Sequence, residues 1–325
     1  MFEVAVIGAG RIGSVHAANA CRHRQLRLAA VVDPSEGAAD GLAGETGARV
    51  AAFDEVLADP AIAGVIIASP TESHLAQAKA VTGAGKAVLL EKPLDLNLDR
   101  ARAAAPSLSG APLLLGFNRR FDPDFAALRR HIVSGALGPL ESLHITSHDP
   151  APPSPAYARA SGGLFKDMAI HDFDIARWLL AEEVTTVFAV TARLVDPESS
   201  DDPDGDTAKT LLRTASGRLC VISNSRRSGY GYDQRIEAFC AGGMARVGNA
   251  PTSGLETWTR SGPGAAPWKD FFLDRYKEAY RRELDHFVDV MAGAAPAVTF
   301  ADGLAALALA EAAALSGRTG EASGP

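Results

Sequence analysis

Three ionisable residues recur at helical spacing near the middle of the chain. Asp167, His171 and Asp174 stand at positions i, i+4 and i+7 of a mostly apolar run, so on an α-helix they would lie on neighbouring faces. A carboxylate and an imidazole in such surroundings need partners, because burying them unpaired costs free energy. Pairing Asp167 with His171 is one way to orient a general base, but a buried pair could equally brace two elements of the fold.

A second group that could do chemistry is Lys92, which follows the apolar run 87–91 and precedes Pro93. The proline restricts the preceding residue to an extended conformation, which fixes the lysine at the end of a predicted strand. A lysine at that place can hydrogen-bond a ribose hydroxyl or polarise a substrate oxygen. A lone surface lysine would have no such meaning, so the interpretation depends on the elements around it.

The glycine-rich segment 8–13 points to a dinucleotide site. It has the pattern G-x-G-x-x-G between an apolar run and a helical pattern, which is the context that this motif requires. Gly8 permits a tight turn, Gly10 lets the backbone approach a pyrophosphate, and Gly13 allows close packing of helix on strand. The helix N-terminus then offers amides to the phosphates. The candidate cofactor contacts in this segment are Gly8, Gly10, Arg11, Ile12 and Gly13.

An acidic residue follows at the distance expected for this motif. Asp33 ends the apolar run 28–32, about 20 residues after the last glycine. Its carboxylate can accept hydrogen bonds from the adenosine ribose hydroxyls and repel a 2′-phosphate. This favours NAD over NADP, although Arg11 could soften the discrimination. Taken alone, Asp33 could also be an ordinary turn residue before Pro34.

Strand-like and helix-like runs alternate through residues 1–118. After the first two strands, further strands are expected at 64–69, 87–91 and 112–117, with helices at 71–84 and 97–105. This pattern predicts an α/β domain of the Rossmann type, with a doubly wound parallel sheet that binds its ligand at the carboxyl ends of the strands. Further candidate cofactor contacts at that edge are Ser69, Pro70, Thr71, His74, Glu91 and Lys92.

From residue 119 onwards the pattern changes. The expected elements are helices at 124–134, 164–179, 273–291 and 302–315, strands at 140–147, 184–195, 207–214, 219–226, 234–240 and 244–247, and a proline-rich loop at 150–155. They predict a second, α+β domain over residues 119–325 with a large open, mainly antiparallel sheet. Its last helix, about 302–317, is a candidate to pack back on the first domain. The acidic stretch 201–206 is expected to be an exposed turn rather than a calcium loop.

Composition limits the class of protein and its partners. The chain has 325 residues, 47% of them hydrophobic, a net charge of −7 and a pI of about 5.6, which argues against nucleic acid or an anionic membrane as partner. No leader is evident, no run approaches the length of a membrane helix, and the scattered residues Cys21, Cys220 and Cys240 fit a reducing cytoplasm. We therefore expect a cytoplasmic protein with a small-molecule substrate.

With these features assembled, the sequence resembles the family of glucose–fructose oxidoreductases and inositol dehydrogenases over nearly its whole length. The tripeptide 91–93 looks like the lysine motif of that family. Gly162-Gly163 followed by Asp167, His171 and Asp174 looks like its substrate-domain signature. Longer strings are similar to those of the inositol 2-dehydrogenases within the family, namely residues 116–123, 168–174, 223–227, 230–233, 270–272, 275–276 and 278–280.

The resemblance implies NAD-dependent oxidation of a cyclic polyol, myo-inositol to scyllo-inosose, by a homotetramer assembled through the open sheet. His171 would be the general base, Asp167 would orient it, and Lys92 would stabilise the developing alkoxide, with no metal required. Weaker candidates for ligand contacts are Asn118, His148, Tyr230 and Tyr232 for the substrate, Tyr280 for the cofactor, and Asp149 for either.

Two alternatives remain at this point. The same chemistry could act on scyllo-inositol, chiro-inositol or a glucose-like pyranose, because a whole pocket rather than one residue distinguishes ring stereochemistry. A non-catalytic NAD-binding sensor could use the same fold, but the presence of Lys92, Asp167 and His171 favours an enzyme. Structural roles, rather than contacts with substrate, are expected for Arg119, Arg120, Asp172 and Asp174.

Overall fold

The computed structural model of the protein describes residues 1–197 and 205–325, which form two compact units. Unit 1 comprises Met1–Asn118 and Ala279–Ala305, and unit 2 comprises Arg119–Glu278 and Ala306–Pro325. The sequence predicts one continuous second domain after Asn118, whereas residues 279–305 belong to unit 1. Most of the acidic stretch 201–206, expected to be an exposed turn, lies outside the described residues.

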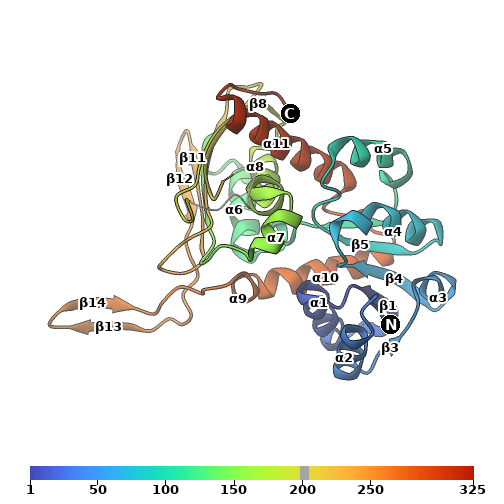
Figure 1. The fold of residues 1–325 in the computed structure, drawn as a ribbon. Helices are drawn as coiled ribbons and strands as arrows, with labels where there is room; N and C mark the ends of the chain where they lie inside the picture. Colours follow the sequence, from blue (N-terminus) through green and yellow to red (C-terminus); the bar gives the residue numbers. More distant parts are fainter. Residues whose placement is uncertain (198–204) are drawn as a thin grey trace. The chain divides into compact units, whose positions relative to one another are not determined.

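A six-stranded sheet in the order β3-β2-β1-β4-β5-β6 forms the centre of unit 1 (Figure 1). Its neighbouring strands run parallel, and the strand order reverses between β1 and β4, the place where doubly wound sheets bind ligands. The prediction of a Rossmann fold is therefore confirmed. The strands are β1 (Phe2–Ile7), β2 (Leu26–Val32), β3 (Arg49–Val50), β4 (Ile62–Ile67), β5 (Ala87–Glu91) and β6 (Leu113–Gly116).

Helices cover this sheet, so its inner strands β1, β4 and β5 are mostly apolar and buried. One of these helices comes from the end of the chain. A Cβ on Gly64 of β4 would lie 2.6 Å from Sδ of Met291 and 2.9 Å from Cζ of Phe287, so glycine lets this late helix approach the strand. The helices of unit 1 are α1 (Arg11–Arg22), α2 (Glu36–Thr46), α3 (Phe53–Ala58), α4 (Thr71–Gly83), α5 (Leu98–Leu108) and nearly all of α10 (Lys277–Met291).

Unit 2 is built on a second six-stranded sheet, in the order β12-β11-β7-β10-β9-β8. Only the pairing of β7 with β10 is parallel among the described strands of this sheet, which confirms the expected mainly antiparallel sheet. The strands are β7 (Leu140–His148), β8 (Val184–Ala192), β9 (Thr207–Thr214), β10 (Leu219–Ser225), β11 (Asp233–Cys240) and β12 (Gly243–Val247).

The two faces of this second sheet differ in what covers them. On β10, Cys220 and Ile222 are fully buried toward the helices, whereas Val221 between them is 38% exposed. The helices are α6 (Pro123–Ser134), α7 (Pro155–Ala160), α8 (Ile170–Leu180) and α9 (Phe272–Arg275). A further hairpin, β13 (Glu256–Thr259) and β14 (Gly262–Ala265), projects from unit 2 as an extended arm (Figure 1).

The helix expected over residues 164–179 is not uniform. Residues Phe165–Ala169 form a π-helical turn, and α8 begins at Ile170. Because a π turn is wider than an α turn, Asp167 does not precede His171 with the regular α-helical geometry that its spacing suggests. The expected burial is nevertheless present, since Leu164 and Met168 are both buried. Single π turns of this kind occur frequently at functional sites.

The last helix, α11 (Phe300–Thr319), contradicts the expectation that no run of the chain approaches the length of a membrane helix. It is long and apolar enough to cross a membrane by length and composition alone, although 56% of its apolar window is buried within the protein. Leu307, Ala310 and Ala313 are fully buried. Packing in the protein therefore accounts for its alanine and leucine content. The boundary between the two units falls within this helix, after Ala305.

Candidate active site

The glycine turn after β1 has the close contacts that a dinucleotide-binding turn requires. Gly8 has a φ of +97°, and a Cβ there would lie 2.5 Å from the carbonyl oxygen of Ala68. A Cβ on Gly13 would lie 1.8 Å from the oxygen of Gly8, so only glycine lets α1 approach the turn. A Cβ on Gly10 would meet nothing within 4 Å. The turn is therefore tight on its inner side and open on the side that a pyrophosphate needs.

Asp33, at the end of β2, is tied to this glycine turn. Its Oδ2 accepts a hydrogen bond of 2.7 Å from the amide of Ala9, and its Oδ1 accepts one of 2.8 Å from the amide of Ser35. These bonds fix the carboxylate beside the turn. Each carboxylate oxygen can accept a second hydrogen bond, so the group remains able to bind a ribose hydroxyl. The residues present thus fit NAD.

The loops after β4 and β5 are linked by His74. Its Nδ1 lies 2.8 Å from the oxygen of Pro93 and its Nε2 lies 3.0 Å from the oxygen of Ser69. Burial lowers the pKa of His74, and the two carbonyl oxygens at its ring nitrogens oppose this effect. The ring holds the Lys92–Pro93 segment and Ser69 at the same edge of the sheet.

A buried pair stands at the end of β5. Nε2 of His16 lies 2.7 Å from Oε1 of Glu91, and the ring of Tyr280, from α10, meets the His16 ring edge-on at 5.7 Å between centroids. Glu91 and Tyr280 were predicted from the sequence, but His16 was missed. A histidine one turn after the last glycine of the motif, on the face toward the sheet, was the signal that could have identified it.

The structure of unit 1 therefore gathers most of the predicted cofactor residues at the carboxyl ends of β1, β2, β4 and β5, in the order expected of the fold. Asn118, a candidate substrate contact, follows β6 and is buried. The predicted cofactor residues at this edge are Gly8, Gly10, Arg11, Ile12, Gly13, Asp33, Ser69, Pro70, Thr71, His74, Glu91 and Lys92.

In unit 2, Asp167 is held by two groups that the sequence did not reveal. Its Oδ2 accepts a hydrogen bond of 2.9 Å from Nη1 of Arg226, and its Oδ1 accepts one of 2.9 Å from the hydroxyl of Tyr157. The same Nη1 lies 3.5 Å from Oδ2 of Asp149. Burial raises the pKa of Asp149 to about 6, against the opposing effect of Arg226. The pairing of Asp167 with His171 stays a prediction.

The two arginines that follow the first sheet form the expected ion pairs. Arg119 donates to Asp172 at 2.5 Å, and Nδ2 of Asn224 donates to the other oxygen of Asp172 at 2.8 Å. Nε of Arg120 donates to Asp174 at 2.8 Å. Both aspartates are fully buried, so these bonds anchor α8 within unit 2 and confirm the structural role expected of these residues.

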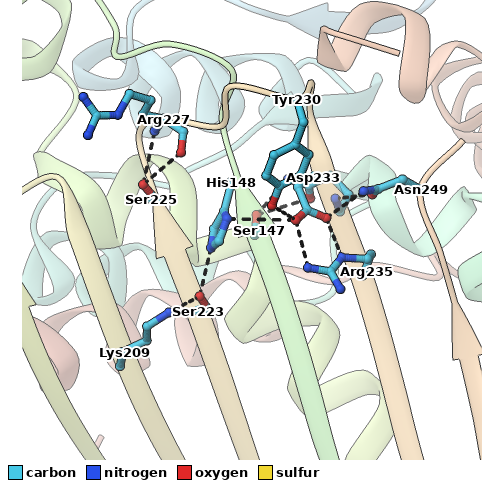
Figure 2. A network of polar contacts seen from close by, with 11 residues as sticks. Ser147, His148, Lys209, Ser223, Ser225, Arg227, Tyr230, Asp233, Arg235 and Asn249 are labelled. Atoms are coloured by element: carbon cyan, nitrogen blue, oxygen red, sulfur yellow. Dashed lines mark hydrogen bonds and ion pairs between the residues drawn. The ribbon is translucent and has the colours of Figure 1, made fainter. Parts of the chain in front are cut away.

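His148 and Tyr230 lie on the opposite face of the second sheet from α8. His148 contacts the hydroxyl of Ser223 at 2.9 Å, and Tyr230 donates to Asp233 at 2.6 Å, as Figure 2 shows. Successive side chains of a strand point to opposite faces, and the neighbouring Asn224 binds α8. Their contact with substrate stays a prediction.

Tyr232 has a different environment from these two residues. It is 7% exposed, and its ring packs edge-on against Tyr276, with 6.1 Å between centroids. Burial raises the pKa of its hydroxyl. Tyr232 thus lies on the side of the sheet that carries α8, together with Arg226. The most informative residue missed by sequence reasoning was Arg226, although it stands in one of the strings that carried the resemblance.

Comparison with known proteins agrees with this arrangement. Residues 2–113 match an oxidoreductase family with an NAD-binding Rossmann fold, and residues 125–246 match the GFO/IDH/MocA C-terminal domain. The chain is 45% identical over 311 residues to an inositol 2-dehydrogenase of Rhizobium meliloti (strain 1021), covering 95% of this chain and 94% of that protein.

Solved structures give the same result. A myo-inositol dehydrogenase from Corynebacterium glutamicum ATCC 13032 is 38% identical, with a TM-score of 0.93 and coverage of 100% of this chain and 98% of that one. A scyllo-inositol dehydrogenase from Lactobacillus casei, solved with NAD(H) and scyllo-inositol, is 26% identical, with a TM-score of 0.92 and coverage of 100% and 99%. The chain therefore belongs to the GFO/IDH/MocA family of oxidoreductases and uses NAD as its cofactor.

Proposed function

We propose that the protein oxidises a ring hydroxyl of a cyclic polyol, converting myo-inositol to scyllo-inosose with NAD as acceptor. The observation that carries the proposal is the similarity over 95% of the chain to a protein named inositol 2-dehydrogenase. The anchoring of Asp167 by Arg226 and Tyr157 supports it, because a carboxylate held in place four residues before a histidine can orient that histidine as a general base.

Each proposed catalytic residue has one task. His171 takes the proton of the substrate hydroxyl, and Asp167 orients its imidazole and stabilises the imidazolium. Lys92 hydrogen-bonds the same oxygen and stabilises the negative charge that develops on it. NAD, when bound, supplies the hydride acceptor. The further proposed substrate contacts are Asn118, His148, Tyr230 and Tyr232, and Tyr280 of unit 1 is a proposed cofactor contact.

The test is NADH formation with NAD and a panel of myo-, scyllo- and chiro-inositol, glucose and xylose. We expect preference for myo-inositol in the wild type and a loss of about 10²- to 10⁴-fold in kcat for His171→Ala. His131→Ala, at an exposed position on α6, is the control and should keep wild-type activity. Preference for another ring would change the substrate and keep the mechanism, whereas NAD binding without turnover on any of them would favour the sensor.

The pH dependence of the reaction tests the general base separately. If His171 accepts the proton, oxidation rises with pH as the imidazole loses its own proton. A kinetic isotope effect from deuterated substrate would show that chemistry limits the rate. A flat profile from mildly acidic to alkaline pH under that condition would exclude His171 as the base.

We also propose that the protein is a homotetramer assembled through the second sheet. The face of this sheet opposite α8 exposes large apolar side chains from several strands, and contiguous apolar surface on a protein marks an interaction site. We place the enzyme in the cytoplasm, because its cysteines are free and fit a reducing compartment. The exposed apolar residues of this face include Phe188, Val190, Leu211, Leu219, Val221, Phe239 and Met244.

A further inference from the structure

A third ionisable group lies beside the buried pair of His16 and Glu91. Glu283 of α10 is fully buried, as is His16, and one ligand-type atom from each of the three residues lies within 4.8 Å of the other two. Within the described part of the chain, neither carboxyl oxygen of Glu283 has a hydrogen-bond partner, and neither does Nδ1 of His16. All three residues belong to unit 1.

The charges of this cluster do not balance if both carboxyl groups are ionised. A protonated His16 would offset one of the two negative charges and leave the other unpaired in a buried site, at a cost of several kcal/mol. Burial, and then the charge of Glu91, raise the pKa of Glu283 well above its usual value. A carboxylic acid kept neutral in this way has an O–H that can donate a hydrogen bond.

The cluster lies next to the end of β5. Glu91 is the last residue of that strand and directly precedes Lys92. It pairs with Gly116 of β6, and a Cβ on Gly116 would lie 3.2 Å from Oε2 of Glu91. The Glu91 carboxylate is therefore enclosed by β6 and His16, with Glu283 close by, so a shift of any of these would move the backbone that carries Lys92.

We propose that Glu283 is a positioning residue of the cofactor site, whose carboxylic acid group donates a hydrogen bond to the Glu91–His16 pair and thereby holds Glu91 and the adjacent Lys92 in place. The ionisable groups beside it are His16 of α1 and Glu91 of β5, and Tyr280, one turn earlier on α10, packs against the His16 ring. The expected effect of Glu283 on turnover rests on the proposed function of Lys92. The protonation of Glu283 does not depend on that function.

Infrared difference spectroscopy of the free protein tests the protonation directly. The wild type is expected to show the carbonyl band of a protonated carboxyl group at pH 8, where Asp149 with its pKa of about 6 is ionised, and Glu283→Gln is expected to lack it. Asp289→Asn, at an exposed carboxyl on the same helix, is the matched control and should keep the band. Absence of the band from the wild type, or its persistence in Glu283→Gln, would overturn the proposal. This measurement needs no substrate, so it stands even if no polyol is oxidised.

Kinetics of the holoenzyme test the positioning role. Glutamine has the size of the protonated acid and can also donate a hydrogen bond. Glu283→Gln should therefore keep kcat within about threefold of the wild type. Glu283→Ala removes the donor and should lower kcat by about 10- to 100-fold, with a smaller change in the affinity for NAD. Wild-type kcat in Glu283→Ala would refute the role.

The same three groups could instead hold a divalent cation, and elemental analysis of the purified holoenzyme separates the two possibilities. We expect no stoichiometric metal in the wild type. The proposal would be overturned if the wild type held stoichiometric metal and Glu283→Gln lost it while still folding, with a kcat as low as that of Glu283→Ala. Glu283 would then be a metal ligand.

Discussion

Arg226 lies between two carboxylates of unit 2. It contacts two carboxylates, Asp167 at 2.9 Å and Asp149 at 3.5 Å, and its own side chain is 4% exposed. Burial and the charge of Asp167 oppose the ionised form of Asp149, whereas Arg226 and Arg119 favour it. Asp149 is the carboxylate whose ionisation is disfavoured, since burial raises its pKa to about 6.

This imbalance predicts how stability depends on pH. The raised pKa means that the contribution of Asp149 to stability is fully present below the pKa of the unfolded chain and is lost as the pH rises through about 6. Asp149→Asn keeps the side chain neutral. Relative to the wild type, it should therefore gain up to about 3 kcal/mol between pH 4 and pH 8.

Urea unfolding at several pH values measures this difference. The control is Asp40→Asn, at an exposed position on α2, whose stability relative to the wild type should change little with pH. A difference between Asp149→Asn and the wild type that is constant from pH 4 to pH 8 would contradict the prediction.

Asp33 carries a prediction about cofactor choice. Replacing it by serine removes the charge that would repel a 2′-phosphate, so kcat/KM with NADP relative to NAD should rise by at least about tenfold. Part of the loss with NAD will come from the glycine turn, because the Asp33 carboxylate also binds the amide of Ala9. Steady-state kinetics with both cofactors give the ratio of kcat/KM with NADP to that with NAD. An unchanged ratio would show that Asp33 does not discriminate between the two cofactors.

At the scale of elements, two glycines of the glycine turn have different tasks: Gly13 allows close packing, and Gly10 leaves room for the cofactor. A Cβ on Gly13 would collide with the oxygen of Gly8 at 1.8 Å, whereas one on Gly10 would meet nothing within 4 Å. Gly13→Ala should therefore destabilise the protein by about 2 to 4 kcal/mol, since backbone must shift. Gly10→Ala should unfold like the wild type but bind NAD at least about tenfold more weakly.

Thermal unfolding and NAD titration of the two variants measure these effects. The control is Gly37→Ala on α2, where a Cβ also meets nothing within 4 Å and where neither property should be lost. Equal loss of stability in Gly10→Ala and Gly13→Ala would contradict this division.

The elements of the first sheet were largely predictable, because strands buried on both faces are continuous apolar runs. The region around residues 165–169 was not. Its apolar periodicity correctly predicts a buried helix. A π turn differs from an α turn by one inserted residue, and the pattern of apolar residues does not reveal this insertion. α2 was missed because its glycines and alanines give weak periodicity, and α7 because it begins at the last proline of a loop.

The site was predictable only where a residue stands in a motif. Gly8, Gly13 and Asp33 follow a strand–turn–helix pattern that the sequence shows directly. His16 and Arg226 reach their carboxylates across 75 and 59 positions of the chain, and no local pattern indicates such a pairing. For the same reason, the sequence could not place His148 on the far face of the sheet, since that depends on strand register.

At the scale of the whole molecule, the apolar face of the second sheet predicts the assembly. Val190 on β8 is 56% exposed, and burying an unpaired carboxylate at an interface costs several kcal/mol. Val190→Asp should therefore dissociate the proposed tetramer. Light scattering should then give less than the mass of four times 33.8 kDa that we expect of the wild type. Val133→Asp, at a 65% exposed position on α6, should leave the mass unchanged, and a wild type of single-chain mass would refute the tetramer.

The return of residues 279–305 to unit 1 has a consequence for how the protein is made. The nascent chain presents the first 118 residues early, but the cover that Phe287 and Met291 give to Gly64, and the hydrogen bond from the amide of Leu115 to the oxygen of Val298, come from its end. The ribosome must therefore release the whole of unit 2's sheet before unit 1 can reach its final packing. The unit that is begun first is completed only after most of the chain has been made.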